Sequence, residues 1–447
     1  MRPKFILLLV LMFLCESLFS QVYNLIDNPS FSTGYTSAQP GGLEEDYPYR
    51  FKVFLPSFAV GFSQNGPSLY DLIKQDANGE YFINFTQEDN LEDQNPYRAA
   101  TTVNTFGLSM NYKNWNFNVG HSARVIGNLN FPRDTYTLLK DGNAKFIGQE
   151  VSVGVALQGT SFNQYALGVS YGTSAARLGV RAKFLTGSQD VSTEEFGVRL
   201  LTDEDIYQLR FTNNYIINTS SLFTYNDLED FSFDFDQNVI NTLFTKNIGL
   251  GFDVGMSFKI SDESMVSVSV YDIGKINWKS NVNNYRSKGG LSFDGLDIAD
   301  YIGNESVVEL RDSLLNLLEF EETTEGYSSS LPTQFNISLL HHFNDKVDID
   351  AAFNLASFNG FSYYNVRLGV FYKFSTIARV GASYSYNQQE IINLGLSAIF
   401  KFGPVQLFAR TDNLLGVLQP IKNGYTNGFI GVNLLFGTPD EIESDFQ

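Results

Sequence analysis

The feature that most constrains this chain is an alternation of apolar and polar residues, which recurs in segments of about ten residues along most of its length. In a β-strand, successive side chains point to opposite faces, so each segment predicts a strand with one apolar and one polar face. The alternation is densest in the C-terminal third. Clear examples are Val151–Leu157, Leu178–Phe184, Leu250–Phe258, Val366–Tyr372 and Val380–Tyr386.

The residues between the apolar ones are mainly Gly, Ser, Asn, Arg, Lys and Asp. Hydrophobic residues make up 43% of the 447 residues and aromatic residues 15%, which is too apolar for a disordered chain. Strands do not alternate with helical patterns, which argues against a soluble TIM barrel or a doubly wound fold. The pattern predicts an all-β fold, a transmembrane antiparallel up-and-down β-barrel. A secreted β-sandwich array or β-solenoid is the alternative, but we find no repeat of fixed period.

The connections between segments predict how the barrel is oriented. Short turns on one side and long links on the other are typical of outer-membrane barrels, whose short turns are periplasmic. The segments suggest about 17 strands, and because single-chain barrels of this class have an even number we predict about 14–16. Short turns are expected at Phe402–Pro404, Ser375–Thr376, Asn344–Lys346, Ser261–Ser264 and Thr202–Asp205, and long links at 413–427, 279–331 and 219–247.

Two short helices are expected in the connections. Ser306 and Glu309 have the spacing of a capping box, and the apolar residues that follow, up to Leu318, share one helical face. This helix would lie in the longest extracellular loop, where it would pack against the barrel mouth, cover the pore or dock a partner. A second helix is expected at Thr135–Lys140.

The N-terminus has the pattern of a cleaved secretory signal. Arg2 and Lys4 precede an apolar run from Phe5 to Leu14. A lipoprotein signal ending at Cys15 is an alternative, although Leu14 before it is not a small residue. Cleavage after Ser20 would remove the only cysteine and exclude a disulfide scaffold. We therefore divide the chain into a signal peptide at 1–20, a periplasmic or plug-like segment at 21–50, the barrel at 51–437 and an acidic tail at 438–447.

Residues that could carry chemistry are few. The net charge of −19 argues against nucleic-acid binding. His341 and His342 are adjacent in a strand and point to opposite faces, and His121 has no histidine nearby. The segment Asp234–Asn238 resembles the start of a calcium loop, but Thr245 occupies the position where such a loop needs Glu. We expect no catalytic, cofactor-binding or metal-binding residues and no cofactor; a barrel hydrolase that uses one of the histidines is the remaining enzymatic hypothesis.

The polar faces predict which residues line the lumen. A charge in lipid costs several kcal/mol, so charged residues between apolar ones should point inward. They could form a structural salt-bridge network or line a polar path for a solute. Trp115 and Trp278 are expected at the long-loop ends of strands, in an aromatic girdle. The predicted lumen-lining residues are Arg177, Arg181, Lys183, Asp348, Asp350, Arg367, Lys373, Arg379 and Lys401.

Several motifs resemble an uncharacterised family of Bacteroidota outer-membrane β-barrels, and the resemblance covers nearly the whole chain after the signal. More distantly, the chain is similar to long-chain fatty-acid transporter barrels and to type IX secretion barrel components. Unlike many such barrels, it does not end on an aromatic residue, because an acidic tail follows Phe436. The motifs are Asn28–Phe31, Val270–Trp278, Leu331–Thr333, Gly403–Phe408, Thr411–Asn413 and Gly431–Gly437.

The resemblance implies a location in the bacterial outer membrane, with membrane lipid and other envelope proteins as partners. It supplies two working hypotheses for function. The first is a channel or transporter for an unidentified solute. The second is a non-enzymatic scaffold or secretion-associated barrel that binds protein partners through its long extracellular loops.

Overall fold

The computed structural model describes residues 49–437, except 77, 80, 85–90, 174, 206, 222, 226–230, 234–242, 294–320, 359–360 and 390. The expected signal peptide, the helix from Ser306 to Leu318, the segment Asp234–Asn238 and the acidic tail lie outside these residues. Within them, no helix is long and apolar enough to cross a membrane.

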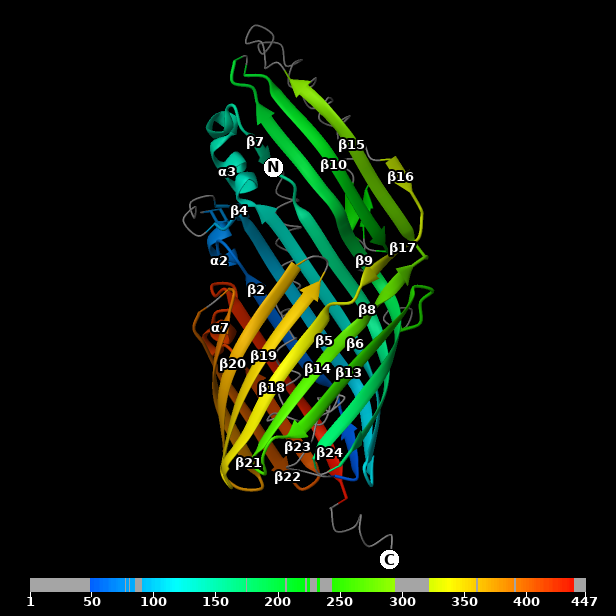
Figure 1. Ribbon diagram of the computed structural model, residues 1–447. Helices are drawn as coiled ribbons and strands as arrows, with labels where there is room; N and C mark the ends of the chain where they lie inside the picture. Colours follow the sequence, from blue (N-terminus) through cyan, green and yellow to red (C-terminus); the bar gives the residue numbers. More distant parts are fainter. Residues whose placement is uncertain are drawn as a thin grey trace, which may run out of the picture.

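Fourteen antiparallel strands close into a barrel, in agreement with the predicted fold class and strand number (Figure 1). The short strands β1 and β2 both pair with β5 on one side and with β24 on the other, so together they form one position in the wall and close the barrel. The wall is formed by β1 (Phe51–Phe54) with β2 (Ser57–Gln64), β5 (Gln94–Tyr112), β6 (Trp115–Pro132), β8 (Ala156–Gly172), β9 (Ala176–Thr202), β13 (Ile248–Lys259), β14 (Ser264–Trp278), β18 (Thr333–Asn344), β19 (Val347–Phe358), β20 (Phe361–Lys373), β21 (Ala378–Asn387), β22 (Asn393–Phe402), β23 (Val405–Thr411) and β24 (Tyr425–Phe436).

Part of the same sheet, which we call the extension, continues beyond the barrel wall (Figure 1). Strand β9 pairs with β13 as far as Thr186, and its remaining part pairs with β10. The extension consists of the end of β9 with β7 (Glu150–Ser152), β10 (Leu209–Ser220), β15 (Val282–Phe293) and β16 (Glu321–Thr323), while β17 (Tyr327–Ser330) pairs with the end of β14.

The extension corrects one part of the sequence analysis. The turn at Thr202–Asp205 joins β9 to β10 at the far end of the extension, on the side of the long links, whereas it was expected among the short periplasmic turns. Strand β10, which follows this turn, pairs with β9 and β15 outside the barrel, and β15 itself lies within the expected long link 279–331. The other four expected short turns join neighbouring wall strands as predicted.

The helices are short and lie in the long-link connections. Helix α3 (Arg133–Asp141) contains the predicted segment Thr135–Lys140. Helices α2 (Leu69–Leu72) and α7 (Leu414–Leu418) begin with the N-caps Ser68 and Asn413, whose side chains accept hydrogen bonds from backbone N–H groups of the first turn. The remaining elements are the 3₁₀ helix η3 (Asn143–Phe146) and the hairpins β3 (Ile73–Gln75)–β4 (Tyr81–Ile83) and β11 (Phe223–Tyr225)–β12 (Phe231–Phe233).

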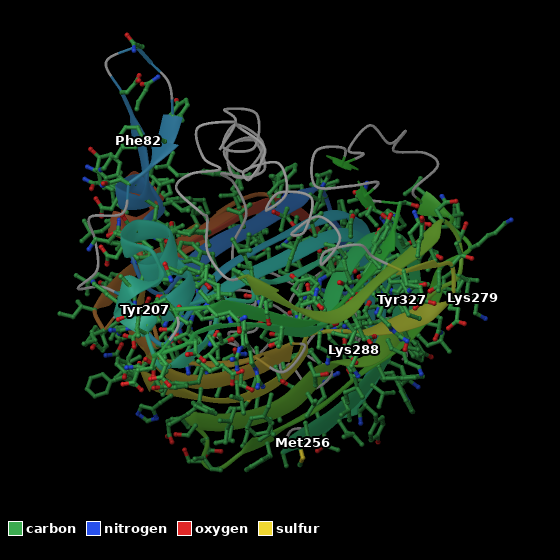
Figure 2. All side chains as sticks on the ribbon, turned by 90° about the horizontal axis from the view of Figure 1, so that it is seen from above. Phe82, Tyr207, Met256, Lys279, Lys288 and Tyr327 are labelled. Atoms are coloured by element: carbon green, nitrogen blue, oxygen red, sulfur yellow. The ribbon has the colours of Figure 1, made fainter. Side chains whose placement is uncertain are left out.

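The two faces of the wall differ as the alternation predicted. Along β13 the apolar residues from Leu250 to Met256 are exposed, while Asp253 between them and Ser257 after them are buried. Met256, 47% exposed, projects outward from the wall when the molecule is viewed from above (Figure 2). Lipid is the environment that suits such an apolar outer face, and closure pairs every strand with two neighbours.

The register of β21 gives a first prediction. Ala382 is exposed on the outer face, and Ser383 is half-buried on the inner face, where Gly369 and Gly395 of the adjacent strands flank it. An arginine at the lipid midplane costs roughly 2–4 kcal/mol, whereas one in the lumen costs much less. Ala382→Arg should therefore impair folding or membrane insertion, and Ser383→Arg should be tolerated. Heat-modifiable migration on a denaturing gel compares them, and equal behaviour of the two variants would contradict the register.

Candidate functional site

The interior of the barrel holds most of its buried charges. Of the nine residues singled out in the sequence, three are half-buried: Arg177, Lys373 and Lys401. The Arg177 guanidinium donates to Ser170, and the Lys401 ammonium contacts the hydroxyl and the ring of Tyr49. The other six, which are buried, belong to three ion clusters: Arg181, Lys183, Asp348, Asp350, Arg367 and Arg379.

The first cluster, which we call the bulge cluster, is centred on an irregularity between β13 and β14. Opposite Asp253, strand β14 has two residues, Tyr271 and Asp272, where regular pairing needs one. Asp272 adopts a positive φ of 56°, and its backbone N–H donates to Oδ1 of Asp253 at 2.9 Å. Aspartate is one of the few residues other than glycine that adopt this conformation readily. The bulge thereby places two carboxylates side by side inside the barrel.

Three cations neutralise this pair of carboxylates. The Lys183 ammonium lies 2.5 Å from Oδ1 of both Asp253 and Asp272. Arg181 Nε lies 2.7 Å from Asp253 Oδ2, and Arg124 Nη1, which comes from β6, lies 2.8 Å from Asp272 Oδ2. All five side chains are nearly inaccessible to solvent. The cluster therefore ties four wall strands together and carries one excess positive charge.

The bulge also explains why the expectation for Trp278 is wrong. Before the bulge, Val266, Val268 and Val270 lie on the outer face of β14. After it, the side chains exchange faces, so Trp278 points inward and is 0% exposed. Its Nε1–H donates to the Ser329 hydroxyl at 2.8 Å. Trp115 is exposed, but it opens β6 directly after the short turn from β5, at the end opposite to the one predicted.

The second cluster surrounds Asp348, near the short-turn end of the barrel. Three side chains contact the carboxylate of Asp348. Arg379 from β21 forms an ion pair with it, Lys373 Nζ lies 3.4 Å from it, and His342 Nδ1 lies 2.7 Å from it. The third cluster lies nearer the long-link end. Arg367 forms a bidentate pair with Asp350 at 2.9 and 3.0 Å, while Arg410 Nη2 donates to Asp412 at 2.8 Å.

The sequence analysis missed several members of these clusters. Asp253 stands between Phe252 and Val254 in the alternating segment Leu250–Phe258. The alternation by itself therefore predicts that Asp253 points to the inner face. Asp272 lies within the motif Val270–Trp278, but a bulge cannot be recognised from the sequence. The charged interior residues not predicted are Lys52, Arg98, Arg124, Asp253, Asp272, Arg410 and Asp412.

The interior has an excess of positive charge. Among the described residues of the wall strands outside the extension, and at Asp412 directly after β23, eleven Lys and Arg side chains that are buried or half-buried accompany five Asp side chains. The whole chain has the opposite balance, with 30 basic and 49 acidic residues. The cations are Lys52, Arg98, Arg124, Arg177, Arg181, Lys183, Arg367, Lys373, Arg379, Lys401 and Arg410; the anions are Asp253, Asp272, Asp348, Asp350 and Asp412.

The three histidines have separate surroundings. His121 Nδ1 lies 2.7 Å from Thr105 Oγ1, and its ring packs against Tyr165. His341 Nδ1 lies 2.9 Å from Ser264 Oγ, and His342 belongs to the Asp348 cluster. In the part of the chain that the structure describes, no three His, Cys, Asp or Glu residues are grouped as metal ligands.

One buried carboxyl group lies in the extension, beyond the last β9–β13 pair. Asp190 on β9 accepts hydrogen bonds from the Tyr327 hydroxyl at 2.8 Å and from the Ser329 hydroxyl at 3.3 Å, both on β17. Burial raises the pKa of Asp190 to about 7, and the hydrogen bonds from Tyr327, Thr160 and Ser329 oppose this rise. Asp190 therefore links β9 to β17 with a strength that depends on its protonation.

The bulge cluster predicts a large effect of a small substitution. Asp272→Asn keeps a residue that tolerates positive φ but removes one of two negative charges that face three cations. Leaving a buried charge without its partner costs roughly 3–5 kcal/mol. We expect a clear fall in the urea midpoint of unfolding in detergent. Asp262→Asn, which removes the same negative charge from an exposed turn, is the control for a change in charge alone, and an unchanged midpoint for Asp272→Asn would contradict this account.

Asp190 predicts a pH dependence of the extension. Its pKa is higher in the folded protein than in an unfolded chain, so its contribution to stability is complete below pH 4 or so and is lost as the pH rises through about 7. Amide hydrogen exchange in Tyr327–Ser330, corrected for intrinsic rates, should be faster at pH 8 than at pH 5.5 or thereabouts. Asp190→Asn should abolish the difference, whereas Glu194→Gln, at an exposed site of the same strand, should retain it. A difference that survives in Asp190→Asn would refute the assignment.

Comparisons with known proteins were made for both the sequence and the fold. No curated protein matches the sequence. Among solved structures, the Ralstonia pickettii toluene transporter TbuX is 9% identical, with 90% of this chain and 93% of that chain covered and a TM-score of 0.44. A Pseudomonas aeruginosa FadL homologue is 12% identical, with 94% and 99% covered and a TM-score of 0.43. The Pseudomonas putida toluene transporter TodX is 8% identical, with 89% and 90% covered and a TM-score of 0.40.

The sequence match to a family is more extensive. Residues 42–412, which include the bulge motif and all but the last strand of the wall, match the family described as a family of unknown function, DUF5723. This match covers most of the chain, and we conclude that the protein belongs to the DUF5723 family.

Proposed function

We propose that this protein is a channel of the bacterial outer membrane that passes a small polar solute through the barrel interior. The observation that carries the proposal is the charged inner face. A barrel that served only as an anchor could be filled with apolar side chains, because buried ion pairs are often no more stabilising than apolar packing of the same volume. Sixteen charged groups inside one barrel therefore favour a role in which charge is used.

The charged groups occur at successive levels along the barrel. The Asp348 cluster lies near the short-turn end, because Asp348 and Arg379 are each the second residue of a strand that begins there. The bulge cluster lies along the middle of β13, and Arg98 lies close to the long-link end of β5. A solute that moved between the two ends would therefore meet polar groups throughout its path, which supports conduction of a polar solute.

Side chains also meet across the barrel. Arg98 on β5 lies 4.3 Å from the centre of the Tyr363 ring on β20, and these strands are on opposite sides of the wall. This contact crosses the interior near the long-link end. The contact supports a path through the interior that Arg98 and Tyr363 narrow near the long-link end.

The extension favours a second candidate function. Its sheet projects beyond the wall on the side of the long links, where Lys279 and Tyr327 lie at the opposite edge from the hairpin that carries Phe82 (Figure 2). A scaffold that binds an envelope protein through this sheet would use such a projection. Affinity purification of the full chain from native membranes would recover a stoichiometric partner if this function holds.

Conduction is tested with the purified full chain in planar lipid bilayers, where we expect discrete conductance steps. Tyr363→Ala should raise the unit conductance, because it removes the ring that meets Arg98 across the interior. Tyr372→Ala, at an exposed position on the outer face of the same strand, should leave it unchanged. A protein that is silent in bilayers and does not admit solutes into liposomes, with or without Tyr363→Ala, would refute the proposed function.

A further inference from the structure

Arg98 differs from the other buried arginines of the interior. The residue is 7% exposed, and both Nε and Nη1 are buried without a hydrogen-bond partner among the described residues. In the same part of the chain no carboxylate lies within ion-pair distance of its guanidinium, whose central carbon lies 4.3 Å from the centre of the Tyr363 ring. Arg124, Arg181 and Arg379, by comparison, each have an aspartate partner.

In this contact the edge of the guanidinium that carries Nε and Nη1 has no acceptor among the described residues. A guanidinium that rests on an aromatic ring uses its flat face, while its N–H groups point outward in the plane. Those groups form a fork that matches two oxygens of a carboxylate or a phosphate. A buried cation with unsatisfied donors is unfavourable by itself, so an oxyanion in the interior would relieve both deficits.

A second unsatisfied donor lies nearby on the strand that carries Tyr363. Asn365 is two residues along β20 on the same inner face, and its buried Nδ2 has no hydrogen-bond partner among the described residues. On both residues the unsatisfied groups are hydrogen-bond donors, so a ligand with acceptor oxygens would satisfy them. The excess of cations over aspartates on the inner face attracts the same class of ligand, because a charged interior with low-dielectric walls concentrates counter-ions.

We infer that the solute is a small oxyanion, with a carboxylate or phosphate group, and that Arg98 binds it near the long-link mouth of the barrel. The inference rests on the proposed channel function and specifies its solute class. Because Arg98 lies on the inner face, the anion comes from solution and not from a lipid headgroup on the outer wall. Bidentate binding to Arg98 holds the anion beside Tyr363, and the interior cations then attract it toward the short-turn end.

The test measures reversal potentials in planar bilayers under gradients of potassium phosphate and potassium acetate. Wild-type protein should prefer the anion to potassium. Arg98→Gln should reduce the anion-to-cation permeability ratio by about twofold or more, and Arg98→Lys, which keeps the charge but not the fork, should fall between them. Lys275→Gln, which removes a positive charge from an exposed position of β14, is the matched control and should retain the wild-type ratio. Heat-modifiable migration establishes that each variant is folded.

Binding is measured separately, so that the inference can be judged without conduction. Inorganic phosphate should raise the melting temperature of the wild-type protein in detergent, and the increase should be lost in Arg98→Gln but kept in Lys275→Gln. Cation preference, or a ratio that Arg98→Gln does not change, would overturn the inference while leaving a channel in place. Silent bilayers would overturn the channel, and the inference would fall with it if phosphate also failed to stabilise the wild-type protein.

Discussion

Closure of the wall through hydrogen bonds between β24 and the pair β1–β2 is the constraint on which the rest of the structure depends. In a bilayer, an unpaired strand edge would leave backbone groups without water or partner, so a spanning sheet must close. Once it is closed, each wall residue has only two environments, lipid or interior. The alternation seen in the sequence is the direct consequence of this restriction.

Closure also explains why so much charge is buried. A charged side chain on a wall strand avoids lipid by pointing inward, and there it needs a counter-charge or an anion from solution. Aspartates on neighbouring strands provide that counter-charge for most of the arginines and lysines. Arg98 is left with an aromatic ring across the barrel. The proposed solute class follows from this incomplete neutralisation.

The bulge at Asp272 joins the structural and the electrostatic parts of this account. It turns a carboxylate inward beside Asp253 and exchanges the two faces of β14 above that level. As a result, Ile276 and Trp278 pack inside, where the wall meets β17 and the extension. One extra residue in a strand thus helps to define both an ion cluster and the junction with the extension.

The sequence by itself determined the fold class, the two faces of most strands and the short turns, because each of these depends on a period of two residues or on a few adjacent residues. The inward direction of Arg181 and Asp350 follows from the same period. Only the tertiary structure decided which strands belong to the wall, since β10 follows a short turn as a wall strand would but pairs with β9 and β15 in the extension. It likewise decided that Asp272 and Trp278 face inward and that Arg98 meets Tyr363, because a bulge shifts the period and a contact across the barrel joins residues far apart in the chain.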